Sequence, residues 1–307
     1  MAGWKASLAS VLKQHNGIKA TDGTISSFET QEKRATVLYQ AFTDLRAKGF
    51  KLADVSQLKG RHVDVLTKHW LSKELSASTL QNNLSILRTF STWIGKDGMI
   101  EGSARYFPNG EAARTSINTE DRGWEAKGVN VEQKLAELRL LDERVAIQVE
   151  LQVRFGLRVK ESVMLRPHLA DKGSYLAIGI GTKGGRDRTV AIKTPEQREL
   201  IERAKQHASS RTASTADPNK SLKQALGHYS RIVSKAALTK AKLGITSHGL
   251  RHRYANDIYH AYTGHRSPVQ GGNLAATDPD LDKAARAVVT EDLGHSREDV
   301  TTNYLGR

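Results

Sequence analysis

Residues 294–307 read GHSREDVTTNYLGR, and this stretch decides how the whole chain is interpreted. Tyr304 lies nine residues after His295, with three residues following it. Four further basic side chains precede them, in the order Arg158, Lys183, His248 and Arg251. Arginines, a lysine and histidines around a phenol are groups that can together attack a phosphodiester without a metal ion. The sequence therefore points to cleavage and rejoining of DNA.

Length and composition restrict the class of protein. The chain has 307 residues, which favours two domains. It contains no cysteine, so disulfides, thiolate zinc sites and cysteine nucleophiles are excluded. No apolar run approaches the roughly 20 residues of a membrane-spanning helix, and the first residues lack the apolar core of a secretory signal. We therefore expect a cytoplasmic, nucleoid-associated protein with no membrane partner, cofactor or metal.

The charge of the chain favours a polyanionic partner. The formal net charge is +14, of which residues 1–124 carry +5 and the remainder +9. A surplus spread over both halves suits a protein that touches DNA with both. A soluble basic protein with no nucleic-acid role is the less favoured reading of the same charge.

The first hundred residues are predicted to form a small helical bundle. Apolar side chains recur at helical spacing within 4–12, 35–45, 63–75 and 80–90. Each apolar stripe covers one helical face, so the helices must pack against one another. The pattern breaks up between residues 95 and 130. We place a linker at 105–128, between an N-terminal helical domain, 1–104, and a second domain, 129–307.

The second domain is predicted to be mainly helical. Helices are expected at 131–141, 143–155, 159–166, 195–207 and 221–242, and a surface loop at 208–220. Two short strands, 174–180 and 189–193, are joined through Lys-Gly-Gly-Arg-Asp-Arg. The predicted fold class is therefore mainly α, with a small β-sheet in the C-terminal domain.

Two of the basic residues stand in local contexts that suit phosphate binding. Arg158 begins a helix in Gly-Leu-Arg-Val-Lys-Glu and offers a planar two-pronged donor, which Glu161 could hold in place. Lys183 lies in a glycine-rich turn, from which its ammonium could project over a bound backbone. Each motif taken alone has an ordinary explanation, as a surface Arg–Glu pair and an exposed turn.

The remaining basic residues have competitors nearby. His248 and Arg251 are three residues apart, which places them on one helical face, but His252 and Arg253 occupy the same stretch. Local spacing does not choose among these four. GHRS at 264–267 resembles GHSR at 294–297, and tyrosines stand at 254, 259 and 262. Only the second histidine has a tyrosine nine residues downstream.

The ordered set resembles the signature of the tyrosine recombinase (phage integrase) family. That signature consists of Gly-Leu-Arg-x-x-Glu, a lysine in a β-hairpin turn, His-x-x-Arg, Gly-His and a terminal tyrosine. The resemblance implies a helical core-binding (SAM-like) bundle followed by a tyrosine recombinase catalytic domain. It also implies Tyr304 as nucleophile and an activating set of Arg158, Lys183, His248, Arg251 and His295. The motif match is specific over 156–304, whereas the bundle is assigned by position and helicity.

In function, the resemblance implies a site-specific recombinase or integrase that cuts and rejoins double-stranded DNA through a covalent 3′-phosphotyrosine intermediate. Integration or excision of a mobile genetic element, a homotetramer on DNA and accessory DNA-bending proteins belong to the same expectation. A type IB topoisomerase and a catalytically idle DNA-binding protein on the same scaffold are the alternatives. The Gly-His motif and the compact bundle favour the recombinase, and all six filled positions disfavour an idle protein.

Two features depart from the family pattern. The 44 residues from Arg251 to His295 exceed the expected spacing, and the excess holds 264–282, which is rich in Gly, Pro and Asp. This insertion is either a folded segment that contacts DNA or a neighbouring protomer, or a long loop. Family members also continue past the tyrosine into a helix that docks on the next protomer. Here that contact is expected to come from elsewhere, unless the chain has been shortened.

Overall fold

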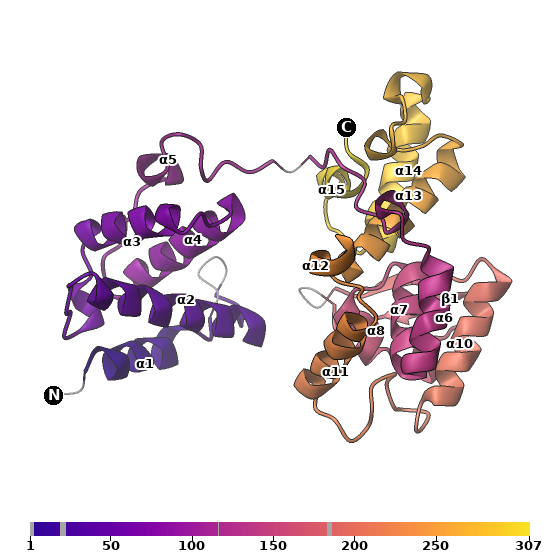
Figure 1. Ribbon diagram of the computed structural model, residues 1–307, viewed down its shortest axis with the longest axis horizontal. Helices are drawn as coiled ribbons and strands as arrows, with labels where there is room; N and C mark the ends of the chain where they lie inside the picture. Colours follow the sequence, from indigo (N-terminus) through magenta and orange to yellow (C-terminus); the bar gives the residue numbers. More distant parts are fainter. Residues whose placement is uncertain (1–2, 19–22, 116, 183–185) are drawn as a thin grey trace. The chain divides into compact units, whose positions relative to one another are not determined.

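Helices make up most of both parts of this protein. The computed structural model describes residues 3–18, 23–115, 117–182 and 186–307. It divides into two units, Met1–Thr115 and Ser116–Arg307, and the sheet found among the described residues lies in the second (Figure 1). The predicted fold class, mainly α with a small β-sheet in the C-terminal domain, is therefore confirmed.

The boundary between the units falls inside the expected linker, 105–128. Tyr106, Phe107 and Ala112 belong to the core of the first unit, whereas Trp124 belongs to a core of the second. The connecting segment thus contributes apolar side chains to both units. The functional domain limits, 1–104 and 129–307, stay a prediction.

Four helices form the first unit around one apolar core. They are α1 (Trp4–His15), α2 (Phe28–Ala47), α3 (Gly60–Ser72) and α4 (Ala77–Trp93), with the 3-10 turn η1 (Val55–Gln57) and the short α5 (Ser103–Tyr106). The ring of Phe42 stacks on Trp4 at 5.9 Å between centroids and meets the edge of Phe90 at 5.7 Å. Such aromatic pairs add to the stability gained from burying the rings. Helix α3 ends before the expected residue 75 because Glu74 adopts a left-handed φ of 50°.

The second unit holds ten helices among its described residues. They are α6 (Val131–Leu141), α7 (Glu143–Phe155), α8 (Val159–Met164), α9 (Pro167–Ala170), α10 (Pro195–His207), α11 (Leu222–Lys235), α12 (Lys240–Leu243), α13 (Ser247–Thr263), α14 (Pro279–Asp292) and α15 (Thr302–Leu305). Short 3-10 turns stand between them: η2 (Glu125–Lys127), η4 (Pro268–Gln270), η5 (Leu274–Ala276) and η6 (Glu298–Thr301). In the described parts of both units, no helix is both long and apolar enough to cross a membrane.

Helix α7 is the centre of the second unit. Ile147, Leu151 and Phe155 pack into a core shared with the sheet and α13. Val149 and Val153 pack into a second core, shared with α6 and α11. A helix that is buried on nearly all sides holds its neighbours in fixed positions. The position of Gly156, which directly follows α7, is therefore fixed by this packing.

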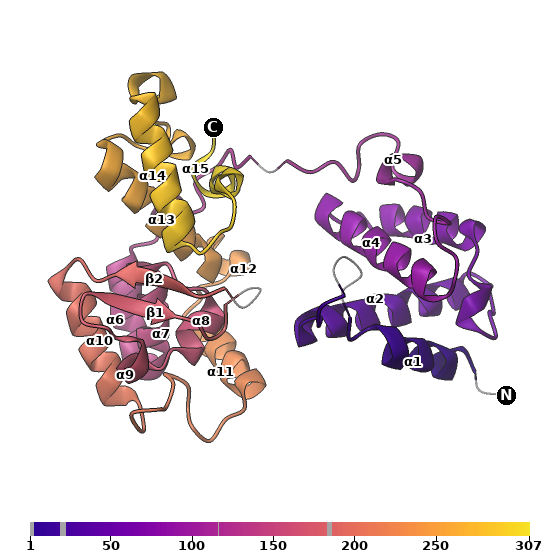
Figure 2. The same ribbon diagram turned by 180° about the vertical axis from the view of Figure 1, so that it is seen from behind.

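The sheet is a single hairpin. β1 (Tyr175–Ile178) and β2 (Arg188–Ala191) pair antiparallel, with Leu176 opposite Val190 (Figure 2). Both of these residues are fully buried in the core that α7 shares with the sheet. Side chains alternate between the two faces of a strand, so Arg188 points to the same side as Val190. Arg188 is therefore a charged side chain on the buried face of the hairpin, at the start of β2.

The expected helix at 221–242 is wrong in its length. The structure has two helices there, α11 and α12, separated at residues 236–239. Ala237 adopts a left-handed φ of 61°, and the backbone N–H of Leu238 donates to the Val233 carbonyl at 3.0 Å. This turn buries the Leu238 side chain completely. Burial of a leucine offsets the strain of one left-handed residue, which helical periodicity does not reveal.

The insertion at 264–282 is folded against its own chain. It contains η4, η5 and the start of α14. The Ser267 hydroxyl donates to Asn256 in α13, and Gln270 donates to Asp121 at 3.1 Å. Of the two readings of this segment, a folded insertion describes it better than a long loop.

We predict that Gly156→Ala destabilises the fold strongly. Gly156 ends α7 at a left-handed φ of 59°, and an added Cβ would lie 2.4 Å from the Tyr254 ring. Backbone strain of about 1–2 kcal/mol then adds to overpacking of about 1–3 kcal/mol. Urea unfolding of the whole chain measures the loss. Gly128→Ala is the control, because Gly128 has a φ of 73° but nothing within 4 Å of an added Cβ. Equal losses in the two variants would refute the steric argument.

Candidate functional site

Tyr304 lies in the short helix α15, with only 4% of its surface exposed. Its hydroxyl is 3.4 Å from Nε of Arg251 and 3.3 Å from Nε2 of His295. The Arg251 guanidinium also lies near the phenol face, 6.0 Å from the ring centroid. Two of the predicted residues, from segments 53 and 9 residues away in sequence, thus meet at the phenol oxygen of the third.

Three contacts hold α15 in place. The Asn118 N–H donates to the Thr302 carbonyl at 2.9 Å, and Arg286 of α14 donates to the Gly306 carbonyl at 3.1 Å. Gly306 has a φ of 74°, and an added Cβ there would lie 2.9 Å from both the Asn118 carbonyl and the Val269 side chain. The helix that carries Tyr304 therefore packs against the start of the second unit, the insertion and α14.

Arg251 is a fully buried cation. It lies in the second turn of α13, with 1% of its surface exposed, and donates to the carbonyls of Gly156 and Leu293. Burial lowers its pKa to about 10, although the Tyr304 phenol acts in the opposite direction. Arg251 therefore stays charged at neutral pH. A buried charge needs such polar partners, and here the backbone supplies them.

A close approach fixes the start of α13. The Trp124 indole donates to the Thr246 carbonyl at 2.8 Å. A Cβ on Gly249 would lie 2.4 Å from the Arg122 carbonyl. Glycine thus allows residues 122–124 to cross the first turn of α13, which carries His248.

Two histidines of α13 flank the tyrosine ring. The His248 centroid lies 5.8 Å from that of Tyr304, and the His252 centroid lies 4.7 Å from it. His252 is buried, whereas His248 is exposed. The surrounding protein, followed by the nearby positive charges, lowers the pKa of His248 to about 4 and that of His252 to about 3. Both rings are therefore neutral at pH 7.

These depressed pKa values couple the fold to pH. Between about pH 6.5, the ordinary value for histidine, and about pH 4, the unfolded chain binds more protons than the folded one. Acidification through this window therefore destabilises the fold, and the stability is regained as the pH rises above it.

Arg158 is joined to the same site through a shared carbonyl. It is the N-cap residue of α8, and its NH2 donates to the Leu293 carbonyl at 3.4 Å. Its NH1 and its backbone N–H both donate to the Glu161 carboxylate, each at 2.7 Å. The expected Arg158–Glu161 pair is present, and it is a partly buried one. Arg158 and Arg251 thus both contact Leu293, one residue before Gly294.

Lys183 lies outside the described residues. The chain that leads to it is described as far as residue 182. Gly181 has a φ of 81°, and an added Cβ would lie 3.0 Å from the Lys160 carbonyl. At Gly181, the described start of the β1–β2 connection therefore lies directly beside α8, the helix that Arg158 caps. Of the other five predicted residues, three lie around Tyr304, namely His248, Arg251 and His295, and Arg158 shares the Leu293 carbonyl with Arg251.

Sequence reasoning missed Arg188. It donates to both oxygens of Glu161 at 2.8 Å and to the Asp292 carbonyl at 2.9 Å. Burial alone would raise the pKa of Glu161, but the hydrogen bonds and charges of Arg188 and Arg158 lower it to about 2. A signal was present, because strand alternation places Arg188 on the inward face with Val190. A charge at an inward strand position indicates a buried partner.

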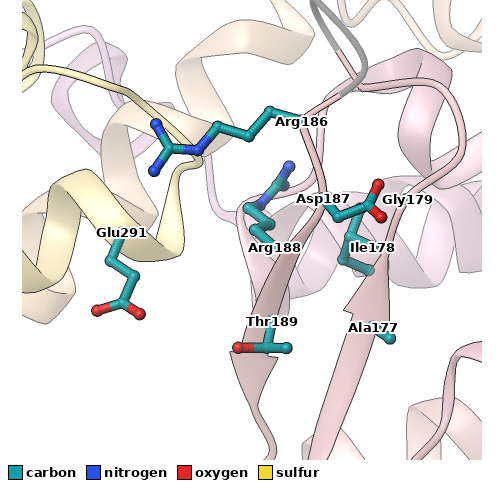
Figure 3. A pocket seen from close by; sticks show the side chains of 8 residues that line it. All are labelled: Ala177, Ile178, Gly179, Arg186, Asp187, Arg188, Thr189 and Glu291. Atoms are coloured by element: carbon teal, nitrogen blue, oxygen red, sulfur yellow. The ribbon is translucent and has the colours of Figure 1, made fainter.

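An open hollow of about 440 Å³ lies beside this site, between the hairpin and α14. Figure 3 shows Arg186 reaching from the hairpin toward the segment after α14, where its NH1 donates to the His295 carbonyl at 2.9 Å. None of the five described site residues lines the hollow. In the part of the chain that the structure describes, no three His, Asp or Glu side chains are grouped as a metal site requires.

Two family models match the chain. The model described as "Phage integrase, N-terminal" covers residues 10–100, and the model described as "Integrase" covers residues 119–257. The second match contains Arg158, His248 and Arg251 but stops before His295 and Tyr304. No curated protein sequence matches the chain significantly.

Solved integrase structures share the fold. A lambda integrase dimer bound to a COC′ core site has a TM-score of 0.61 at 15% identity, covering 96% of this chain and 94% of that one. The Tn1549 transposon integrase in complex with transposon right end DNA has a TM-score of 0.59 at 13% identity, covering 98% and 95%. A lambda integrase tetramer bound to a Holliday junction has a TM-score of 0.58 at 15% identity, covering 94% and 74%. These matches extend across both units and show that the fold is shared. The two family models together cover most of the chain, which therefore belongs to the phage integrase, or tyrosine recombinase, family.

Proposed function

We propose that this protein is a site-specific DNA recombinase that cuts and rejoins double-stranded DNA through a 3′-phosphotyrosine at Tyr304. The observation that carries the proposal is the meeting of Arg251 and His295 at the Tyr304 hydroxyl. Similarity to integrases that were solved on core-site and transposon-end DNA supports the substrate class. The net charge of +14 favours the same polyanionic partner.

The arginines supply charge where the phosphate needs it. A guanidinium has five N–H donors. Contacts within the described residues use three of those of Arg251 and two of those of Arg158. The remaining donors bind the two non-bridging oxygens of the scissile phosphate and offset charge as the pentavalent state forms. The protein already holds both guanidinium groups near the phenol, which favours the reaction once the phosphate is bound. Because Arg251 is 1% and Tyr304 4% exposed, the phosphate can reach them only after the surrounding chain opens.

The proton and the bonds balance without a cofactor. The Tyr304 oxygen attacks phosphorus, the bond to the 5′ oxygen breaks, and the phosphotyrosine retains the bond energy for rejoining. His248, neutral in the free protein, accepts the phenol proton. The hydrogen bond of His295 shifts from the phenol oxygen to an oxygen of the phosphate. Lys183 protonates the leaving 5′ oxygen. Attack of a 5′ hydroxyl on the phosphotyrosine then reverses these steps.

The acting form is an assembly on DNA. Lambda integrase was solved as a dimer on a core site and as a tetramer on a Holliday junction. We infer a homotetramer for strand exchange here, with accessory DNA-bending proteins as further partners. Integration or excision of a mobile element is the process that such an assembly would serve.

We predict that Tyr304→Phe abolishes the covalent adduct and leaves DNA affinity nearly unchanged, since it removes one oxygen that the protein already binds. The assay incubates wild type and variant with duplexes from the ends of the host element, followed by denaturing electrophoresis and mapping of the nick. Tyr262→Phe is the control, because Tyr262 is exposed on α13. An adduct formed by Tyr304→Phe would refute the proposal. Relaxation of supercoils without a preferred site would favour the topoisomerase alternative, and DNA binding without any adduct would favour the idle scaffold.

The lowered pKa of His248 predicts the pH profile. Its value of about 4 means that the proton acceptor stays neutral in the free protein well below pH 6.5. The second-order rate constant of adduct formation reports ionisations of the free protein. The ratio of wild-type to His248→Gln rate constants should therefore stay constant from pH 8 to pH 5.5. His265→Gln, which alters an exposed histidine, is the control. A ratio that falls with an apparent pKa near 6.5 would contradict the assignment of His248.

Binding should depend steeply on salt. Each neutralised phosphate contributes about 0.9 log units of affinity per log unit of salt. Titration of a fluorescent duplex at several salt concentrations with Tyr304→Phe, which binds without cleaving, gives the slope. A flat response would remove the electrostatic account of DNA binding.

A further inference from the structure

We propose that Arg188 is a positioning residue of the cleavage site, which holds Arg158 in the geometry for phosphate binding by fixing Glu161. The inference rests on the proposed function. Arg188 begins β2, directly after the hairpin connection, and 7% of its surface is exposed. Its partner Glu161 is fully buried. The pair therefore lies beneath the phosphate-binding side chains, as part of their support.

The two arginines bind Glu161 differently. Arg188 makes a two-pronged contact, with NH1 and NH2 each 2.8 Å from a carboxylate oxygen. The Arg158 side chain makes one contact with that carboxylate, through NH1 at 2.7 Å. Two-pronged pairing fixes the plane of the carboxylate as well as its position. One oxygen of Glu161 thus receives the Arg158 side chain at a fixed angle. The NH2 group of the Arg158 guanidinium then points away from Glu161, toward the Leu293 carbonyl.

Arg188 is itself fixed from the opposite side. Its Nε donates to the Asp292 carbonyl at 2.9 Å. A Cβ on Gly294, whose φ is 64°, would lie 2.8 Å from Cδ of Arg188. Glycine at the Gly-His motif therefore makes room for the arginine stem. In Figure 3 the Arg188 side chain lies between the hairpin and α14, with Glu291 pointing away from it.

The charge balance explains what Arg188 contributes. Without it, the buried Glu161 carboxylate would have one arginine left to pair with. The carboxylate would then turn fully onto Arg158, in the two-pronged geometry that such pairs prefer. This would take up donors that Arg158 needs for DNA. Arg188 donates a hydrogen bond to each oxygen of the Glu161 carboxylate, so that Arg158 keeps N–H donors for a phosphate.

The chain provides a matched control away from the site. Glu150 of α7 is also buried and is also bound by two arginines, Arg139 at 2.9 Å and Arg203 at 2.6 Å. None of the five described site residues hydrogen bonds or forms an ion pair with this cluster. Arg203→Met therefore removes an arginine from a buried glutamate without touching the site. A purely structural role of Arg188 predicts similar effects of Arg188→Met and Arg203→Met on cleavage.

The test is a mutant cycle with single-turnover adduct formation as the readout. Displacing a catalytic group by about 1 Å lowers a rate by up to about 10²-fold. We expect Arg188→Met to lower the cleavage rate constant about 10- to 100-fold, and Arg203→Met to change it less than about threefold. DNA affinity should change less than about threefold in both, and Arg188→Lys should recover part of the rate. In an Arg158→Ala background, Arg188→Met should add less than about a threefold loss, because its target is gone.

Several outcomes would overturn the inference. One is a full additional loss from Arg188→Met in the Arg158→Ala background. Another is an equal loss of cleavage in Arg203→Met, or a loss of DNA affinity that accounts for the slower cleavage. If Arg188→Met does not fold, as judged by thermal unfolding, the same cycle with Arg188→Lys decides by the same criteria. A wild-type protein that forms no adduct would refute the proposed function, and the inference with it. Active wild type with an additive cycle would refute the inference alone.

Discussion

Three guanidinium groups converge on two backbone carbonyls at the end of α14, and the arrangement of the site depends on this convergence. Arg188 donates to Asp292, while Arg158 and Arg251 donate to Leu293. The last carbonyls of a helix lack partners within the helix and carry partial negative charge. They therefore attract cations that would otherwise repel one another. The residue after Leu293 is Gly294, whose left-handed turn directs His295 back to the phenol.

This arrangement places charged guanidinium groups beside uncharged imidazole rings. The arginines keep their charge because backbone carbonyls and Glu161 satisfy them. The histidines next to them are neutral, because the surrounding protein and the neighbouring cations both oppose protonation. In the proposed reaction, a phosphate that enters the site would meet preorganised cations, and the phenol would face groups that can take up a proton. One local environment would then serve both halves of the proposed transfer.

Much of the fold could be predicted from sequence, because helical periodicity is a local signal. The two-unit helical architecture and the small hairpin are of this kind. The candidate site residues were chosen from the order of motifs between 158 and 304, and their catalytic roles stay a prediction. The break between α11 and α12 was missed, since the left-handed Ala237 is stabilised by burial of Leu238, which depends on tertiary packing. Arg188 was missed because its role depends on Glu161, 27 residues earlier in the chain. Lys183 lies outside the described residues, so its place in the set stays a prediction.

The hydrogen bond between Asn118 and Thr302 links distant parts of the sequence. Asn118 stands three residues after the end of the first unit, and Thr302 opens the helix that carries Tyr304. A pull along the connecting chain would therefore reach the tyrosine helix before most of the second unit. In mechanical terms the helix that carries Tyr304 has two anchors, the connecting segment through Asn118 and the core of its own unit through Tyr304 and Leu305.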